Sequence, residues 1–237
     1  IGVYGLVAAL LVETRAADED YLQSYIEDIE KTIRSLFVAR PVEFTTSPTE
    51  SAQLWNIRKG LFPSVGAMRE TGTSVIIEDV AFPVPRLAEA TLELQSLFKK
   101  HRYNEAIIFG HALEGNLHFV FAQSFNTQSE VDRYAAFMDD LAEMVVKKYD
   151  GSLKAEHGTG RNMAPYVELE WGADAYALMK EIKNMFDPEN LLNPGVILNP
   201  DKHIHVKNLK PLPSAHPIVD KCIECGFCEV QCPSKNL

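Results

Sequence analysis

The sequence predicts an α+β fold in which helices pack on a mixed or antiparallel, ferredoxin-like sheet. Two apolar runs, residues 106–109 and 117–121, are joined by a short connection that contains Gly115 and Asn116. Such a pair accepts the positive φ that a tight hairpin needs, and a hairpin pairs its strands antiparallel. Residues 73–80 form a further strand-like run. Strands that alternate with helices would otherwise favour a parallel sheet, so the hairpin decides the fold class.

Helices are predicted where apolar residues recur every three or four positions. The first is expected over residues 18–37, where the apolar stripe indicates packing and not a functional site. The second should begin at Ser47, which suits the N-cap position. A proline follows it at the first helical position, and Glu50 stands three residues after the cap, as is typical of a helix start. Three further helices are expected, over residues 87–98, from 131 to near 151, and over 173–185.

The composition limits the possible classes of protein. With 237 residues, of which 46% are hydrophobic, the chain can build one sizeable core and an appendage. The formal charge of −10 argues against nucleic acid and anionic lipid as partners. The sequence contains neither a signal peptide nor the roughly 20 apolar residues of a membrane helix. We therefore expect a cytoplasmic protein, either free or peripheral to the inner membrane.

All four cysteines lie in the last sixteen residues, as Cys222, Cys225, Cys228 and Cys232 before a proline. Thiolates are the soft ligands of iron–sulfur clusters, and this spacing predicts a partial ferredoxin-type 4Fe–4S motif. A zinc site would need two separated CxxC pairs, and a disulfide framework would spread its cysteines through a small domain. In two-cluster ferredoxins the fourth cysteine serves the other cluster, so half of the module is expected to be missing and the cluster to be lost in air.

We expect three regions. Residues 1–198 form the α+β body, residues 199–217 a proline-spaced linker, and residues 218–237 the iron–sulfur tail.

A second candidate metal site comes from histidines near the predicted hairpin turn. His111 and His118 flank this turn, and a later segment adds Glu156 and His157. Two imidazoles and one carboxylate can bind a divalent metal and leave positions open for a substrate. From spacing alone, histidines that only form structural hydrogen bonds are the competing interpretation.

Three separated motifs in order resemble the C-terminal domain of FAD-linked oxidases: residues 110–118 (GHALEGNLH), 156–160 (EHGTG) and 186–195 (FDPENLLNPG). That family includes D-lactate dehydrogenase, the glycolate oxidase flavin subunit and D-2-hydroxyglutarate dehydrogenase. Residues 55–62 and 69–72, together with the cysteine motif, are most similar to long bacterial members with a fused iron–sulfur module. The resemblance covers almost everything from about residue 5 to the end.

The resemblance implies flavin-dependent oxidation of a D-2-hydroxy acid. By family position, His111, His118 and Glu156 would hold a divalent metal, usually zinc, and His157 would be the general base. A metal lowers the pKa of a bound hydroxyl, so a neutral imidazole can take its proton while hydride leaves C2 for the flavin.

Further roles are implied for one arginine and two asparagines. Arg58 matches the family arginine that binds the substrate carboxylate, although a surface charge on a helix is the alternative. Asn116 and Asn193 lie in segments that approach the flavin in the family, but both also suit turns with unusual φ.

Two departures from the family leave the substrate open between D-lactate and D-2-hydroxyglutarate. Relatives specific for 2-hydroxyglutarate use a lysine to bind the distal carboxylate, and Ile77 stands at that position here. An apolar residue cannot neutralise a carboxylate, and Arg69 is a candidate substitute. Val120 replaces an asparagine found in some relatives.

We expect the chain to be a fragment, inactive alone, because no segment for binding FAD is recognised and the family binds it in an N-terminal domain. Electrons would pass from FAD to the cluster and then to an acceptor such as a quinone. Two alternatives remain: a non-catalytic electron-transfer subunit with a ferredoxin-like module, and a non-catalytic interaction domain.

Overall fold

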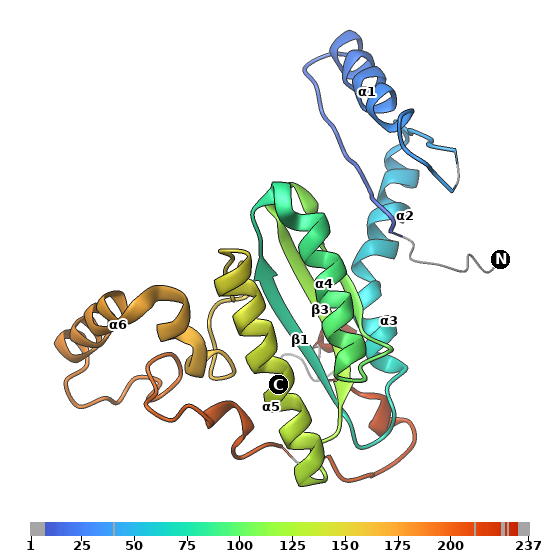
Figure 1. Ribbon diagram of the computed structural model, residues 1–237. Helices are drawn as coiled ribbons and strands as arrows, with labels where there is room; N and C mark the ends of the chain where they lie inside the picture. Colours follow the sequence, from blue (N-terminus) through green and yellow to red (C-terminus); the bar gives the residue numbers. More distant parts are fainter. Residues whose placement is uncertain (1–7, 40, 211, 224–225, 227, 232–237) are drawn as a thin grey trace. The chain divides into compact units, whose positions relative to one another are not determined.

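The computed structural model describes residues 8–39, 41–210, 212–223, 226 and 228–231 (Figure 1). The chain divides into two compact units, residues 1–61 and residues 62–237. Among the helices of the described residues, none is long and apolar enough to cross a membrane.

Over residues 8–39 and 41–61, the first unit contains the helices α1 (Glu19–Ile33) and α2 (Pro48–Lys59). Asp18 and Ser47 cap them, since each side chain accepts a hydrogen bond from the backbone N–H three residues later, at 3.0 and 3.4 Å. The predicted start at Ser47 is therefore confirmed. Neither helix has a fully buried residue, so the apolar stripe of α1 is only half-buried.

The second unit is built on a three-stranded antiparallel sheet, as predicted. Its strands are β1 (Ser74–Ala81), β2 (Ile107–His111) and β3 (Asn116–Gln123), in the order β1-β3-β2. The hairpin between β2 and β3 turns through the short helix η2 (Ala112–Glu114) and Gly115, whose φ is +66°. Asn116, expected to share the positive φ, instead begins β3, because one residue in the left-handed region completes this turn.

Within the described part of this unit there are four α-helices, of which α3 had no counterpart among the predicted helices. They are α3 (Leu61–Ala67), α4 (Leu87–Lys100), α5 (Gln128–Ala142) and α6 (Val167–Phe186). α5 continues as a π-helical segment, η3 (Glu143–Lys148). α6 begins earlier than predicted and kinks at Gly172, which takes a non-helical φ of +79°. Short 3-10 helices occur at Val84–Arg86, Ala164–Tyr166, Ile204–Val206, Val219–Lys221 and Glu229–Gln231.

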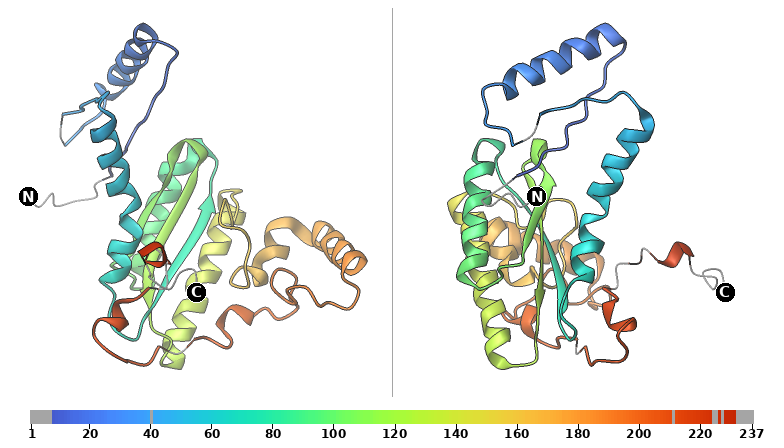
Figure 2. Two further views of the ribbon diagram at one scale, coloured as in Figure 1. Left: turned by 180° about the vertical axis from the view of Figure 1, so that it is seen from behind. Right: turned by 90° about the vertical axis from the view of Figure 1, so that its right-hand side faces the viewer.

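Helices α4 and α5 cover one face of the sheet (Figures 1 and 2). The core between them is aromatic: Phe98 stacks on Phe137 with ring centroids 5.3 Å apart, and Phe119 is fully buried against both. Side chains alternate between the faces of a strand, so Leu117, Phe119 and Phe121 enter this core. The same alternation directs His118 to the opposite face of the sheet.

Candidate functional site

The candidate metal ligands come together on the sheet face opposite α4 and α5. His118 lies within β3, and His111 ends β2, where it pairs with Asn116. Paired residues of an antiparallel sheet point to the same side, so both imidazoles reach one face. Glu156 comes from the loop that follows Ser152, and Ser152 bridges to Ala81 at the end of β1.

The three side chains are close enough to share a cation. Glu156 Oε1 lies 2.8 Å from His118 Nε2 and 3.4 Å from His111 Nε2, and the ligand atoms lie within 4.8 Å of one another. Zinc bound at about 2.0–2.2 Å separates neighbouring tetrahedral ligand atoms by about 3.3 Å, so the donor set fits a divalent metal. The side chain of His118 is 4% exposed, whereas those of His111 and Glu156 are each 51% exposed. The exposed side of the cluster leaves room for further ligands.

His157 stands beside this cluster in a position suited to proton transfer. Its ring stacks on His118, with centroids 4.6 Å apart and planes at 7°, and its Nε2 lies 3.8 Å from Glu156 Oε1. Burial and the neighbouring His157 lower the pKa of His118, against the opposing effect of nearby carboxylates. A neutral imidazole is the form that binds metals.

Asp79 organises the site and was missed in the sequence analysis. It is fully buried, and its Oδ2 accepts hydrogen bonds from the backbone N–H groups of Ala155, Glu156 and His157 at 3.0, 2.7 and 2.9 Å. Burial alone would raise the pKa of Asp79, but these N–H groups and Asn116 outweigh it and hold the pKa below its ordinary value. The carboxylate is therefore an ionised anchor for the loop that carries Glu156 and His157.

One signal in the sequence could have revealed this anchor. Glu78 and Asp79 are adjacent acids inside an apolar strand, and acids are rarely buried unless they are paired. Glu78 points to the other face and bonds the ammonium group of Lys154 and the amide of Asn162. The two neighbouring carboxylates of β1 thus bind successive residues of one loop. Glu78 binds the side chain of Lys154, and Asp79 binds the backbone N–H groups of the three residues that follow.

Asn116 contributes to the same arrangement from β3. Its Nδ2 donates to Asp79 Oδ1 at 2.5 Å and to the Val80 carbonyl at 3.1 Å. Within the described residues, Asn116 Oδ1 and His118 Nδ1 are buried without a hydrogen-bond partner. Asn193, the other residue predicted near the flavin, has a φ of +47° and lies in an exposed turn.

The two arginines predicted to bind substrate lie in different units. Arg58 is on α2, in the first unit. Arg69 belongs to the second unit, where its guanidinium donates to the carbonyl oxygens of Glu70, Thr73, Asp220 and Cys222 at 2.8–3.2 Å. Four backbone carbonyl oxygens therefore accept hydrogen bonds from the Arg69 guanidinium.

The cysteine motif is described in part. Cys222 and Cys228 are exposed free thiols, while Cys225 and Cys232 lie outside the described residues. Accessible thiols are the soft donors that an iron–sulfur cluster requires, so the described part of the motif fits such a group.

Comparison of the sequence with known proteins identifies the family of the chain. Residues 6–197 match the FAD linked oxidases, C-terminal domain. The chain is 26% identical over 194 residues to the glycolate oxidase subunit GlcD of Bacillus subtilis, an alignment that covers 82% of this chain and 40% of that protein. It is 28% identical over 187 residues to the D-2-hydroxyglutarate dehydrogenase of Xanthomonas citri, with coverages of 78% and 39%.

A third relative is the mitochondrial D-lactate dehydrogenase [cytochrome] of Arabidopsis thaliana, 34% identical over 163 residues, with 66% of this chain and 27% of that protein covered. The chain thus spans 40% or less of the length of these three relatives. Because the family match extends over most of its residues, the chain belongs to the FAD-linked oxidases, whose C-terminal domain it contains.

Proposed function

We propose that this chain is the substrate- and metal-binding part of a flavin-dependent dehydrogenase that oxidises a D-2-hydroxy acid to the 2-oxo acid. The observation that carries the proposal is the convergence of His111, His118 and Glu156 beside His157. The names of the three relatives, which refer to glycolate, D-2-hydroxyglutarate and D-lactate, support the substrate class.

His111, His118 and Glu156 hold the divalent metal in this proposal, and zinc suits two imidazoles and one carboxylate. When bound, the metal supplies Lewis-acid chemistry that lowers the pKa of the substrate hydroxyl. His157 accepts the hydroxyl proton at Nε2, the nitrogen nearest to Glu156 Oε1 at 3.8 Å. Loss of that proton from oxygen and of a hydride from C2 leaves the 2-oxo acid.

FAD, the hydride acceptor, is held mainly by a domain outside this chain in our proposal. The chain covers 40% or less of the length of each of the three relatives, and this supports a separate FAD-binding domain. Asn116 and Asn193 are the residues of this chain that we assign to the flavin side. Arg58 is assigned to substrate binding by the resemblance. Arg69 is a candidate only as a substitute for the absent lysine, and its Nη1 and Nη2 already donate to four backbone carbonyls.

The sheet next to the site favours a small monocarboxylate over a dicarboxylate. Ile77 pairs directly with Val120 across β1 and β3, two residues from the Asp79–His118 pair on the same face. Apolar side chains cannot compensate the charge of a distal carboxylate. D-Lactate is therefore our first candidate and D-2-hydroxyglutarate the second.

In this proposal Cys222, Cys225, Cys228 and Cys232 would hold a 4Fe–4S cluster, which would supply electron transfer from the flavin toward an external acceptor such as a quinone at the cytoplasmic side. Four cysteines with ferredoxin spacing support this route. The second candidate function is a non-catalytic electron-transfer subunit, favoured by the same cysteines.

The function is tested with the full-length protein, a panel of D-2-hydroxy acids and the artificial acceptor dichlorophenolindophenol. Turnover of one D-acid, with its L-enantiomer inert, supports the dehydrogenase. Metal analysis of a variant with all four cysteines changed to serine separates the alternatives. About one zinc or manganese retained per chain supports the histidine site, whereas loss of all metal supports the electron carrier.

A further inference from the structure

The C-terminal segment of residues 204–210 and 212–223, here called the strap, lies against the second unit at successive points. At its start, His205 is 6% exposed and Val206 packs against the hydrophobic core. The guanidinium of Arg161 donates to the carbonyl of Ile204 at 3.2 Å and to that of Lys207. The first part of the strap is thus fastened to the α+β body.

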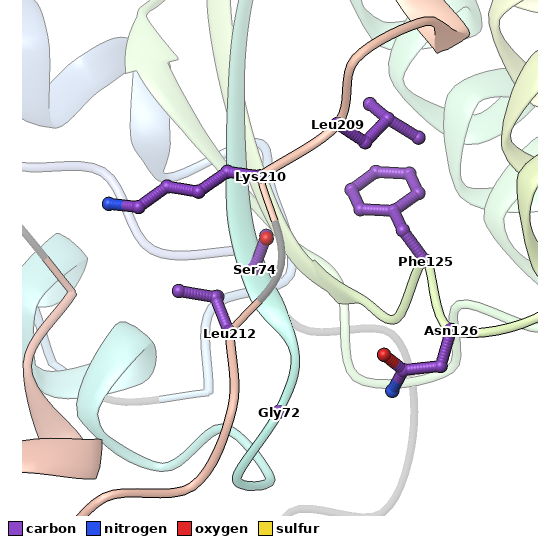
Figure 3. A pocket seen from close by; sticks show the side chains of 7 residues that line it. All are labelled: Gly72, Ser74, Phe125, Asn126, Leu209, Lys210 and Leu212. Atoms are coloured by element: carbon purple, nitrogen blue, oxygen red, sulfur yellow. The ribbon is translucent and has the colours of Figure 1, made fainter.

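The middle of the strap crosses near the start of β1 and the segment after β3. Figure 3 shows Leu209 beside the ring of Phe125, and Leu212 near Ser74. These residues line one small pocket, together with Gly72, Asn126 and Lys210. The strap therefore follows the domain surface on its way to the cysteines.

The end of the strap is held by Arg69, from the connection between α3 and β1. One nitrogen of its guanidinium, Nη1, donates to the carbonyls of Thr73 at 2.8 Å and Glu70 at 3.2 Å. The other, Nη2, donates to the carbonyls of Asp220 at 2.8 Å and Cys222 at 2.9 Å. A planar fork can join two backbone segments in this way, whereas the single ammonium of lysine cannot match it.

A close contact beside Arg69 adds to the attachment. A Cβ atom on Gly66 of α3 would lie 2.6 Å from Ile223 Cδ1, closer than side chains normally approach. Ile223 follows Cys222 directly, so the residue next to a predicted cluster ligand packs on α3.

We propose that Arg69 is a positioning residue that fastens the Cys222 end of the iron–sulfur motif to the substrate domain. The proposal rests on the proposed function in one respect, namely that Cys222 binds a cluster. Electrons then leave at a fixed point of the domain instead of from a freely moving tail. The guanidinium also puts a permanent positive charge 2.9 Å from the carbonyl of a cluster ligand. A cation so placed favours the reduced, more negative cluster and raises its midpoint potential.

The test uses the full-length protein with Arg69→Gln, Arg69→Lys and the control Arg86→Gln, all kept anaerobic. Arg86 is a matched control because it also donates to a backbone carbonyl, that of Lys148 at 3.0 Å. Trypsin cleavage after Lys221, followed by mass spectrometry, reports release of the strap. We expect about tenfold faster cleavage for Arg69→Gln, since two hydrogen bonds from a charged donor to the strap are lost. The control should keep the wild-type rate.

Two further measurements separate charge from geometry. In a redox titration followed by electron paramagnetic resonance, Arg69→Gln should move the cluster midpoint to a more negative potential, while Arg69→Lys keeps it near wild type. Arg69→Lys should nevertheless be cleaved faster than wild type. Ile223→Ala, which leaves α3 and β1 unchanged, should also accelerate cleavage after Lys221.

A wild-type cleavage rate in Arg69→Gln would overturn the proposal, as would an unchanged midpoint potential in that variant. Failure of the wild-type protein to oxidise any D-2-hydroxy acid would instead refute the proposed function. The cleavage rates would then still decide whether Arg69 holds the strap.

Discussion

Asp79 Oδ1 lies 3.3 Å from His118 Nδ1, and the two residues are direct partners across β1 and β3. The same carboxylate accepts the backbone N–H groups of Glu156 and His157 through its other oxygen. One buried side chain is therefore placed behind a candidate histidine ligand, and it also holds the loop that supplies the carboxylate ligand. Such outer partners orient metal ligands and commonly change affinity when they are lost.

Asp79→Asn should weaken zinc binding by about 10- to 100-fold, because the amide is neutral and places its NH2 donor against either the backbone N–H groups of the loop or Asn116 Nδ2. Equilibrium dialysis in the cysteine-free background measures this loss. Asp132→Asn, an exposed change on α5, serves as the control and should bind zinc as the parent does. Unchanged zinc affinity in Asp79→Asn would remove the positioning role.

His157→Gln and His118→Asn should fail in different ways. His157→Gln keeps the three ligands, so the full-length variant should retain its metal and lose about 10²- to 10⁴-fold in kcat, the usual contribution of a general base. His118→Asn should lose metal and turnover together. Elemental analysis and steady-state kinetics on the same preparations check both expectations, and near-normal kcat in His157→Gln would exclude it as the base.

The buried pair of Glu78 and Lys154 should matter for stability. Their side chains are 5% and 14% exposed, so Lys154→Met leaves a buried carboxylate without its cation and should cost about 3–5 kcal/mol in the free energy of unfolding. Lys147→Met breaks the exposed pair with Glu143 and should cost less than about 1 kcal/mol. Urea unfolding measures both, and adding Glu78→Gln to Lys154→Met should recover part of the loss.

Asp187 should make stability depend on pH at the acidic end. The ammonium of Lys183, helped by the N–H groups of Leu192 and Leu191, lowers the pKa of Asp187 from 3.8 to about 2. A depressed folded-state pKa stabilises the protein above the unfolded value, and this contribution is lost as pH falls from about 4 through about 2.

The stability difference between wild type and Asp187→Asn should therefore be constant from pH 7 to 5 and shrink between pH 4 and 2. Lys183→Met should move this loss to higher pH, because it removes the largest cause of the shift. Urea midpoints measured across this range provide the check. A difference that does not vary with pH would contradict the assignment.

Ile77→Lys should shift substrate preference toward the dicarboxylate. A cation at this position would lie directly opposite Val120, on the site side of the sheet. We expect kcat/KM for D-2-hydroxyglutarate relative to D-lactate to rise by about tenfold, the effect of one added ion pair in a partly desolvated site. Ile77→Met controls for the change in side-chain length and should leave the ratio as it is.

Much of the fold could be predicted because it depends on local patterns. The β2–β3 hairpin, the capped start of α2 and the amphipathic α4 each follow from short-range periodicity or turn chemistry. The early start and the kink of α6 could not be read in this way, since Gly172 interrupts the helix without ending it. The contacts of the strap could not be predicted either, because a proline-spaced segment has no periodicity that would indicate packing on a domain.

Residue identity and spacing establish which chemical groups are available: imidazoles near one turn, a Glu156–His157 pair, and cysteines with ferredoxin spacing. The fold adds what no local pattern carries: the imidazoles share one sheet face with Glu156, Asp79 holds the backbone of the Glu156 loop, and Arg69 reaches the cysteine segment. The physical reason is that residue identity is encoded locally. Strand register and the attachment of loops depend on hydrogen bonds between residues far apart in the sequence. Arg69 and Cys222, for example, are separated by 153 positions.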